Sequence, residues 1–194
     1  MPATEGDFRV SRPPPNGCTR AHPCYNGPKM RYPLTSADQG RMDLPNLNPE
    51  YIRELIALTN ASPYPDHIAM KVVELDLDRA VIELQTAPCH LQPFGNVHGG
   101  VLATLIDTAT FWAAFMRIPE DCGMVNVDLK LNYLKAVDSG VLIAQATTIH
   151  AGKSISYAEA TIYDSSRRRI AHGTSTLMTL KGKGLKLGSR KFLD

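Results

Sequence analysis

A helical pattern over residues 98–116 constrains the fold of this chain more than any other segment. Apolar side chains recur along it at helical spacing and cover much of its circumference, which predicts a helix buried in a protein core. The main stripe consists of Val101, Leu105, Ala109, Trp112 and Met116. A membrane span is the rival interpretation. However, a histidine, an aspartate and three threonines interrupt the run, and an aspartate at mid-bilayer costs on the order of 3 kcal/mol.

The segments before this helix predict one amphipathic helix and one hairpin. Asn48 followed by Pro49 has the pattern of an N-cap with proline at the first helical position, and the apolar spacing continues to about Asn60. Two strand-like runs follow, and turn residues join them. The expected strands and the loop after them span residues 68–75, 79–86 and 88–95.

Four further strand-like runs follow the central helix, separated by residues that are common in hairpin turns. They span residues 125–134, 141–150, 154–163 and 169–180. Consecutive runs of this kind predict a meander of long antiparallel strands. The full order of elements predicts an α+β fold in which one antiparallel sheet wraps around the central helix.

The chain has 194 residues, of which 43% are hydrophobic, enough to bury one sizeable core. Residues 1–48 are rich in proline and lack a sustained apolar period, so we expect a disordered N-terminal extension. Met42 precedes the first expected helix and is a candidate functional start. The globular domain is expected over residues 49–181, and residues 182–194 are expected to form a loose basic tail.

Charge and cysteine content exclude several classes of function. A formal net charge of +2 is too small to indicate nucleic acid as the main partner. The N-terminal residues lack the pattern of a secretion signal, so we expect a cytoplasmic location. Cys18, His22 and Cys24 resemble an incomplete metal site, but a fourth ligand is not evident nearby. We therefore expect no metal, no nucleic acid and no membrane among the partners.

The start and the middle of the predicted central helix carry the candidate chemistry. Gly99 and Gly100 would leave main-chain N–H groups at the positive end of the helix dipole, which suits an oxyanion or a polarised carbonyl. Asp107 places a carboxylate on an apolar helix, where desolvation is costly. Together they indicate an acyl-transfer site. The alternatives are that His98 and the glycines only cap the helix, and that Asp107 is a satisfied polar group at a subunit contact.

These residues form an N-x-H-G-G-x(6)-D motif, and the strand-like sequence VDLKLNYL of residues 127–134 follows it. The combination resembles the PaaI-type hotdog-fold thioesterases of the 4-hydroxybenzoyl-CoA thioesterase superfamily, over residues 49 to about 181. The resemblance implies the hotdog fold and hydrolysis of acyl-CoA thioesters without a metal or organic cofactor. It also implies a homodimer, with homotetramers formed as dimers of dimers.

The resemblance implies roles for individual residues of the motif. Asp107 would be the catalytic carboxylate, acting as a general base or as a nucleophile. The N–H of Gly99 would polarise the thioester carbonyl, while Gly100 shapes the turn and His98 orients the site.

Two expected catalytic positions depart from the family pattern. Gln92 stands where the family usually has asparagine, and Asn126 where it usually has serine or threonine. Both side chains still form hydrogen bonds, so we expect an altered substrate preference or rate before a loss of activity.

Helix geometry indicates that a complete site needs two chains. His98 and Asp107 are nine residues apart, about 13 to 14 Å along a helix axis, which is too far for both to touch one acyl carbon. A two-fold dimer with antiparallel central helices would place Asp107 of one chain opposite Gly99 of the other. We therefore expect an obligate dimer for activity.

Candidate substrate-binding residues come from several segments, although aromatic residues at helical spacing also suit a core and turn charges also suit a solvated surface. The expected set is Asn96 in the motif, Phe94, Phe111, Trp112, Phe115 and Tyr133 around the acyl group, and Gly152, Lys153 and Ser154 near the CoA phosphates. The alternative function is a non-catalytic acyl-CoA-binding sensor on the same scaffold. The sequence does not name the acyl group.

Overall fold

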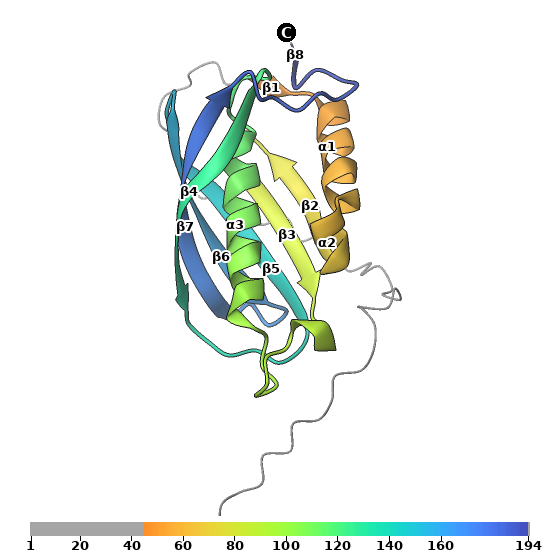
Figure 1. The fold of residues 1–194 in the computed structure, drawn as a ribbon, viewed down its shortest axis with the longest axis vertical. Coiled ribbons are helices and arrows are strands. Elements are labelled where there is room, and N and C mark those ends of the chain that lie inside the picture. The colour runs from red at the N-terminus through yellow and green to blue at the C-terminus, as the bar shows by residue number, and fades with distance from the viewer. Residues whose placement is uncertain (1–44, 194) are drawn as a thin grey trace, which may run out of the picture.

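One antiparallel sheet curls around a long central helix in the computed structural model, which describes residues 45–193 (Figure 1). The predicted α+β architecture is confirmed. The elements are β1 (Asn46–Leu47), α1 (Pro49–Ala61), α2 (Pro63–His67), β2 (Met70–Asp76), β3 (Arg79–Gln85), the 3₁₀ turn η1 (Pro88–His90), α3 (Gly99–Phe115), β4 (Cys122–Tyr133), β5 (Val141–Ala151), β6 (Ile155–Asp164), β7 (Arg169–Lys181) and β8 (Phe192–Leu193). The expected disorder before residue 45, the candidate start at Met42 and the Cys18–Cys24 pattern lie outside the described residues.

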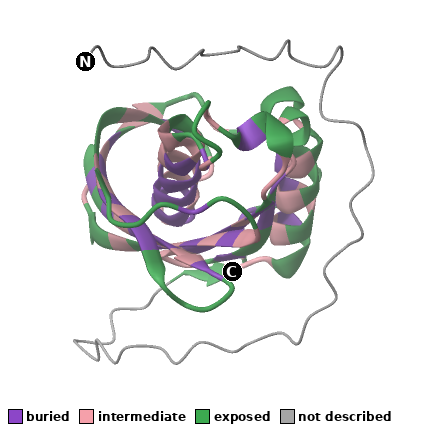
Figure 2. Cartoon of the chain, turned by 90° about the horizontal axis from the view of Figure 1, so that it is seen from below, coloured by how far each residue is buried: buried purple, intermediate pink, exposed green. Residues whose placement is uncertain are grey.

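The central helix α3 is buried, as its apolar circumference predicts. Leu105, Ile106, Ala109 and Ala113 have no exposed surface, and α3 contacts all six strands of the sheet. Figure 2 looks along the barrel-like curve and shows the buried face of α3 inside it. Full burial of one face and partial burial of most other positions explain why apolar residues predominate in this helix.

The sheet has the order β2-β3-β5-β6-β7-β4, so the predicted four-strand meander is wrong at its first strand. Strand β4 pairs with β7 over Cys122–Tyr133, and the meander comprises β5, β6 and β7 alone. Alternating hydrophobicity identifies strands but not their neighbours, and here the chain crosses from one edge of the sheet to its middle between β4 and β5. Strand β4 is left at the edge.

Two helices lie beside the central helix and β2. Asn48 caps α1 as predicted, because its side chain accepts a hydrogen bond from the Glu50 N–H at 2.9 Å. The short helix α2 and the turn η1 were not predicted from the sequence. In η1 the buried His90 ring forms hydrogen bonds with the Ala87 N–H and the Ile68 carbonyl, which orders a segment expected to be a loop.

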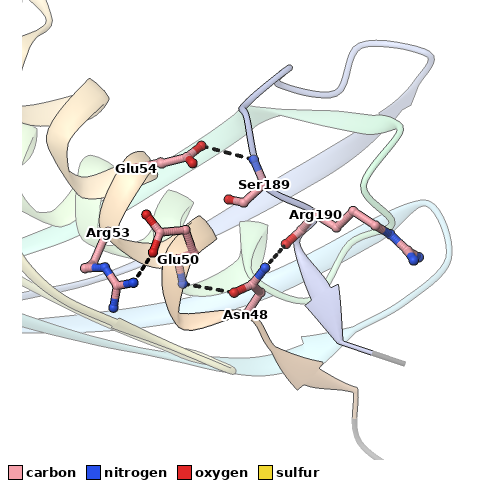
Figure 3. A network of polar contacts seen from close by, with 6 residues as sticks. All are labelled: Asn48, Glu50, Arg53, Glu54, Ser189 and Arg190. Carbon is pink, nitrogen blue, oxygen red and sulfur yellow. Dashed lines mark hydrogen bonds and ion pairs between the residues drawn. The ribbon is translucent and has the colours of Figure 1, made fainter.

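The prediction of a loose tail after residue 181 is wrong for the described residues. Strand β8 pairs with β1, which itself lies inside the segment expected to be disordered. Figure 3 shows the link to α1: Glu54 accepts hydrogen bonds from the main chain at Ser189, and Asn48 donates to the Arg190 carbonyl. We call residues 182–193 the C-terminal segment. The basic composition of this segment did not indicate these contacts, because they are made by main-chain atoms.

Candidate active site

Asp107 lies near the middle of α3, half-buried, with its carboxylate held by one side chain. The Asn126 amide donates a hydrogen bond from Nδ2 to Asp107 Oδ1, and Nδ2 is also 3.5 Å from the Asp107 main-chain oxygen. A carboxylate only accepts hydrogen bonds, so the amide nitrogen must face it. Among the described residues no group donates to the second oxygen, Oδ2. One carboxylate oxygen is therefore held and the other is available.

Buried hydroxyls fix the helix behind Asp107. Thr110 Oγ1 donates to the carbonyls of the preceding turn and lies 2.8 Å from Ser175 Oγ on β7. Both hydroxyl residues are fully buried. Because a buried hydroxyl that loses its partner is costly, this contact maintains the position of α3 against the sheet.

The N-terminal end of α3 has a different arrangement. His98 is the N-cap, and its Nδ1 accepts a hydrogen bond from the Gly100 N–H at 2.8 Å. Among the described residues none accepts a hydrogen bond from the Gly99 N–H. The Tyr133 hydroxyl donates to the Gly99 carbonyl at 3.3 Å, and a Cβ at position 99 would lie 2.9 Å from that hydroxyl. A helix N-terminus thus presents one available donor under a tyrosine ring.

The loop before α3 holds three more predicted residues. The Gln92 side chain accepts a hydrogen bond from the Phe94 N–H at 2.5 Å, and its main-chain N–H donates to the Asn96 carbonyl at 2.8 Å. The loop turns at Gly95, whose φ of 85° is one that residues with a side chain rarely adopt. Phe94 points outward and is 82% exposed. Within one chain, Gln92 therefore stabilises the conformation of this loop through its hydrogen bonds to Phe94 and Asn96.

A cavity of about 460 Å³ opens beside Asp107. Its walls come from α1, α2, α3, the starts of β2 and β4, and the C-terminal segment. Phe111, Trp112 and Phe115 contribute an aromatic cluster, with the Phe111 and Trp112 rings 4.9 Å apart in an edge-to-face contact. The cavity is mostly apolar, as small-molecule sites commonly are.

Within one chain the predicted residues therefore fall into three groups. The first lies at the cavity: Asp107, Phe111, Trp112 and Phe115 line it, and Asn126 holds Asp107. The second surrounds the N-terminus of α3: Gln92, Phe94, Asn96, His98, Gly99, Gly100 and Tyr133. The third is the β5–β6 turn at Gly152, Lys153 and Ser154. Gly99 and Asp107 are eight residues apart on one straight helix, about 12 Å along its axis, so one chain does not join the first two groups.

Several cavity residues were missed in the sequence. Leu58 and Tyr64 come from the N-terminal helices, and Lys183 and Leu185 come from the C-terminal segment. The amphipathic pattern of α1 was a usable signal for Leu58, since a helix end with apolar residues beyond its core face requires a further contact. No short-range pattern indicated the other three.

Lys191 is a further residue that the sequence did not single out, and it lies outside the cavity lining. It is fully buried, and its Nζ donates to the carbonyl of Phe115, the last residue of α3, at 2.5 Å and to that of Ile118, just beyond the helix, at 2.8 Å. The ammonium also lies 4.3 Å from the centre of the Phe115 ring. Burial lowers the pKa of Lys191 to about 7, although Glu120 and Cys122 oppose this shift.

Over residues 45–193, no helix has the length and apolar character needed to cross a bilayer. The same residues contain no group of three or more histidine, cysteine, aspartate or glutamate side chains arranged to hold a metal ion.

Comparison with known proteins places these features in one family. Residues 94–171 match the family model described as Thioesterase superfamily. A 1,4-dihydroxy-2-naphthoyl-CoA hydrolase of Listeria monocytogenes is 29% identical over 114 residues, which is 59% of this chain and 93% of that protein. ComA2 of Bacillus subtilis is 30% identical over 115 residues, 59% of this chain and 91% of that protein.

Solved structures give the same result for the fold. The crystal structure of Haemophilus influenzae thioesterase HI1161 superposes with a TM-score of 0.64, at 24% identity, and the match covers 70% of this chain and 94% of that one. The structure of Rv1847 from Mycobacterium tuberculosis superposes with a TM-score of 0.60 at 28% identity, covering 63% and 99%. This chain therefore belongs to the thioesterase superfamily, has the hotdog fold of that superfamily and is a thioester hydrolase.

Proposed function

We propose that this protein hydrolyses acyl-CoA thioesters to a free acid and CoA, with Asp107 as the catalytic residue. The observation that carries the proposal is the Asp107 carboxylate, held on one oxygen by Asn126 and opening into an apolar cavity. The similarity to a hydrolase named for a CoA thioester supports CoA esters as the substrate class. The reaction needs no group beyond side chains, main-chain donors and water, and we propose a cytoplasmic location.

The proposed chemistry divides between a base or nucleophile and an oxyanion donor. Asp107 takes a proton from water as the water oxygen bonds to the acyl carbon, or its own oxygen bonds there first and forms an anhydride that water then cleaves. In both routes the C–S bond breaks, and the CoA sulfur leaves with the electron pair and gains a proton. The water oxygen enters the acid when water attacks the acyl carbon, whereas attack on the aspartyl carbon of the anhydride places it in Asp107 and transfers an Asp107 oxygen to the acid. The Gly99 N–H stabilises the negative charge that develops on the carbonyl oxygen.

We infer that each site combines two chains, because Gly99 and Asp107 are about 12 Å apart along one helix. Strand β4 offers the contact surface: it is a twelve-residue edge strand, and Val125, Val127 and Leu129 are exposed on it. An edge of this length and apolar character is rarely left unpaired. A two-fold pairing of β4 with its copy gives two equivalent sites.

In this dimer the other predicted residues take the following roles. Gln92, Phe94, Asn96, His98, Gly100 and Tyr133 would reach the substrate from the chain that supplies Gly99. Lys153, which is exposed in the turn between Gly152 and Ser154, would contact CoA phosphates. Exposed Ile155 and Met178, which pair across β6 and β7, offer an apolar outer face for a dimer of dimers.

Mixed dimers test the shared site. Gly99→Pro removes the proposed donor at the first helical position, where proline is tolerated, and the half-exposed Tyr133 has room to move aside. Asp107→Asn removes the base. We expect each variant alone to be inactive in a thiol-release assay with acyl-CoA esters. Co-expression in equal amounts should restore about a quarter of the wild-type rate, because half of the dimers then hold one intact site of two.

The control pairs Asp107→Asn with Asn126→Ala, which lie in the same half of the site, so mixing them should restore nothing. Failure of the Gly99→Pro and Asp107→Asn pair to regain activity would contradict a shared site. A wild-type protein that binds acyl-CoA esters but releases no thiol would instead favour the acyl-CoA-binding sensor.

A further inference from the structure

We propose that the C-terminal segment closes the acyl cavity at the end remote from the thioester and thereby limits the length of the acyl chain. This inference rests on the proposed acyl-CoA hydrolysis. Lys183 and Leu185 line the cavity together with Phe111 and Phe115 of α3. The segment that was expected to be a loose tail is thus part of the substrate site.

The direction of the cavity follows from helix geometry. Asp107, Phe111 and Phe115 are four residues apart and share one side of α3, so the stripe extends about 12 Å from the carboxylate toward the end of the helix. An acyl group whose carbonyl lies at Asp107 would extend along this stripe. It would meet the C-terminal segment where α3 ends.

Two glycines allow the C-terminal segment to pack closely against residues 120–123, which follow α3. A Cβ at Gly123 would collide with the Lys183 carbonyl, and a Cβ at Gly184 would collide with the Glu120 carbonyl. The Gly184 N–H also donates to the Asp121 carbonyl at 3.0 Å. Backbone meets backbone here without intervening side chains, which gives the wall a defined position.

Further along, the segment is held by polar contacts to α1 and by Lys191. The Glu54 carboxylate accepts hydrogen bonds from the main-chain N–H groups of Gly188 at 2.8 Å and Ser189 at 3.3 Å. Asn48 Nδ2 donates to the Arg190 carbonyl at 2.9 Å (Figure 3). Lys191 joins the segment to the end of α3. These contacts fix the segment to α1 and to the end of α3, and both helices contribute residues to the cavity wall.

The family model ends at residue 171 and starts at residue 94, so it contains neither the C-terminal segment nor α1 and α2. The cavity walls facing α3 come largely from these flanking parts. Acyl selectivity in this chain is therefore set outside the residues that define the family, and Leu185 is its specificity-determining residue.

Substitutions at Leu185 test the inference in both directions. Leu185→Ala enlarges the cavity end and Leu185→Phe fills it, and the side chain is partly exposed, so neither change threatens folding. The ratio of kcat/KM for long over short straight-chain acyl-CoA esters should rise roughly tenfold or more in the first and fall in the second. Leu193→Ala is the matched control, because Leu193 belongs to the same segment but not to the cavity wall. Unchanged ratios in both Leu185 variants would overturn the inference.

A binding assay separates this inference from the proposed function. Trp112 is the single tryptophan of the chain and lines the cavity, so its fluorescence reports occupancy by straight-chain fatty acids without any hydrolysis. We expect the affinity to decrease beyond a limiting chain length, and Leu185→Ala to shift that limit to longer acids. This result in a protein without thioesterase activity would support the cavity assignment while removing the hydrolase. No fluorescence change with any chain length would overturn the cavity assignment even if hydrolysis is observed.

Discussion

At the scale of single residues, the arrangement of Asp107 and Asn126 is the most informative feature. The asparagine comes from β4, next to the irregular register between Asn126 and Asp128, and reaches across to a carboxylate on the helix that the sheet surrounds. Its second polar atom, Oδ1, is buried and lacks a partner among the described residues. An unpaired buried acceptor is costly, so the amide is held here for its contact with Asp107.

We predict that Asn126→Ala lowers kcat by on the order of 10²-fold, because a carboxylate released from its donor leaves the reactive geometry. The measurement is steady-state thiol release from an acyl-CoA ester. Asn126→Ser restores a hydrogen-bonding group at the same position and should recover part of the rate. Equal kcat for the alanine variant and the wild type would show that Asn126 does not position the base.

At the scale of elements, α3 is held differently at its two ends. His98 satisfies one main-chain N–H at the start, and the Lys191 side chain satisfies two carbonyls at and beyond the end. The sequence offered capping by His98 as one of two interpretations, because the partners of this contact are two residues apart. It did not predict the second, because Lys191 is 76 residues from Phe115 and lies in a segment of ordinary basic composition.

The buried Lys191 predicts a dependence of stability on pH. Burial lowers the folded pKa of Lys191 to about 7, while the unfolded side chain keeps its proton to about pH 10. Between these values the unfolded state binds more protons, so the free energy of unfolding should rise with pH, by at most about 1.4 kcal/mol per pH unit. Denaturant titrations of the wild type and Lys191→Met at neutral and alkaline pH measure this. Parallel pH profiles for the two proteins would contradict the shifted pKa.

At the scale of the whole molecule, local patterns predicted which elements exist but not every neighbour. The spacing of apolar residues and the Asn48 and His98 caps were sufficient for α1, α3 and the six main strands. The placement of β4 beside β7 depends on pairs of residues 38 to 59 positions apart in the sequence, such as Asn126 with Leu177. The same holds for the candidate site. The residues of the motif could be predicted because they are close together in the sequence. Leu58, Tyr64 and Leu185 come from distant segments and line the cavity only after the chain has folded.

The exposed edge predicts the assembly. Val127→Lys on β4 places a charge in the proposed strand pairing, so we expect a monomer with kcat/KM reduced by on the order of 10²-fold or more. Light scattering gives the mass and the thiol-release assay gives the activity. Val73→Lys on β2, the opposite edge of the same sheet, is the matched control and should leave both unchanged. A fully active monomer would exclude an obligate dimer.

The pairing of β1 with β8 brings Asn46 beside Leu193 at the end of the molecule where α3 finishes. Gly99 lies at the other end of that helix. These two residues therefore lie at one pole of the described chain, about 25 Å of helix length away from the Gly99 N–H of the same chain. A label on the Asn46 side chain is therefore remote from the Gly99 N–H of its own chain.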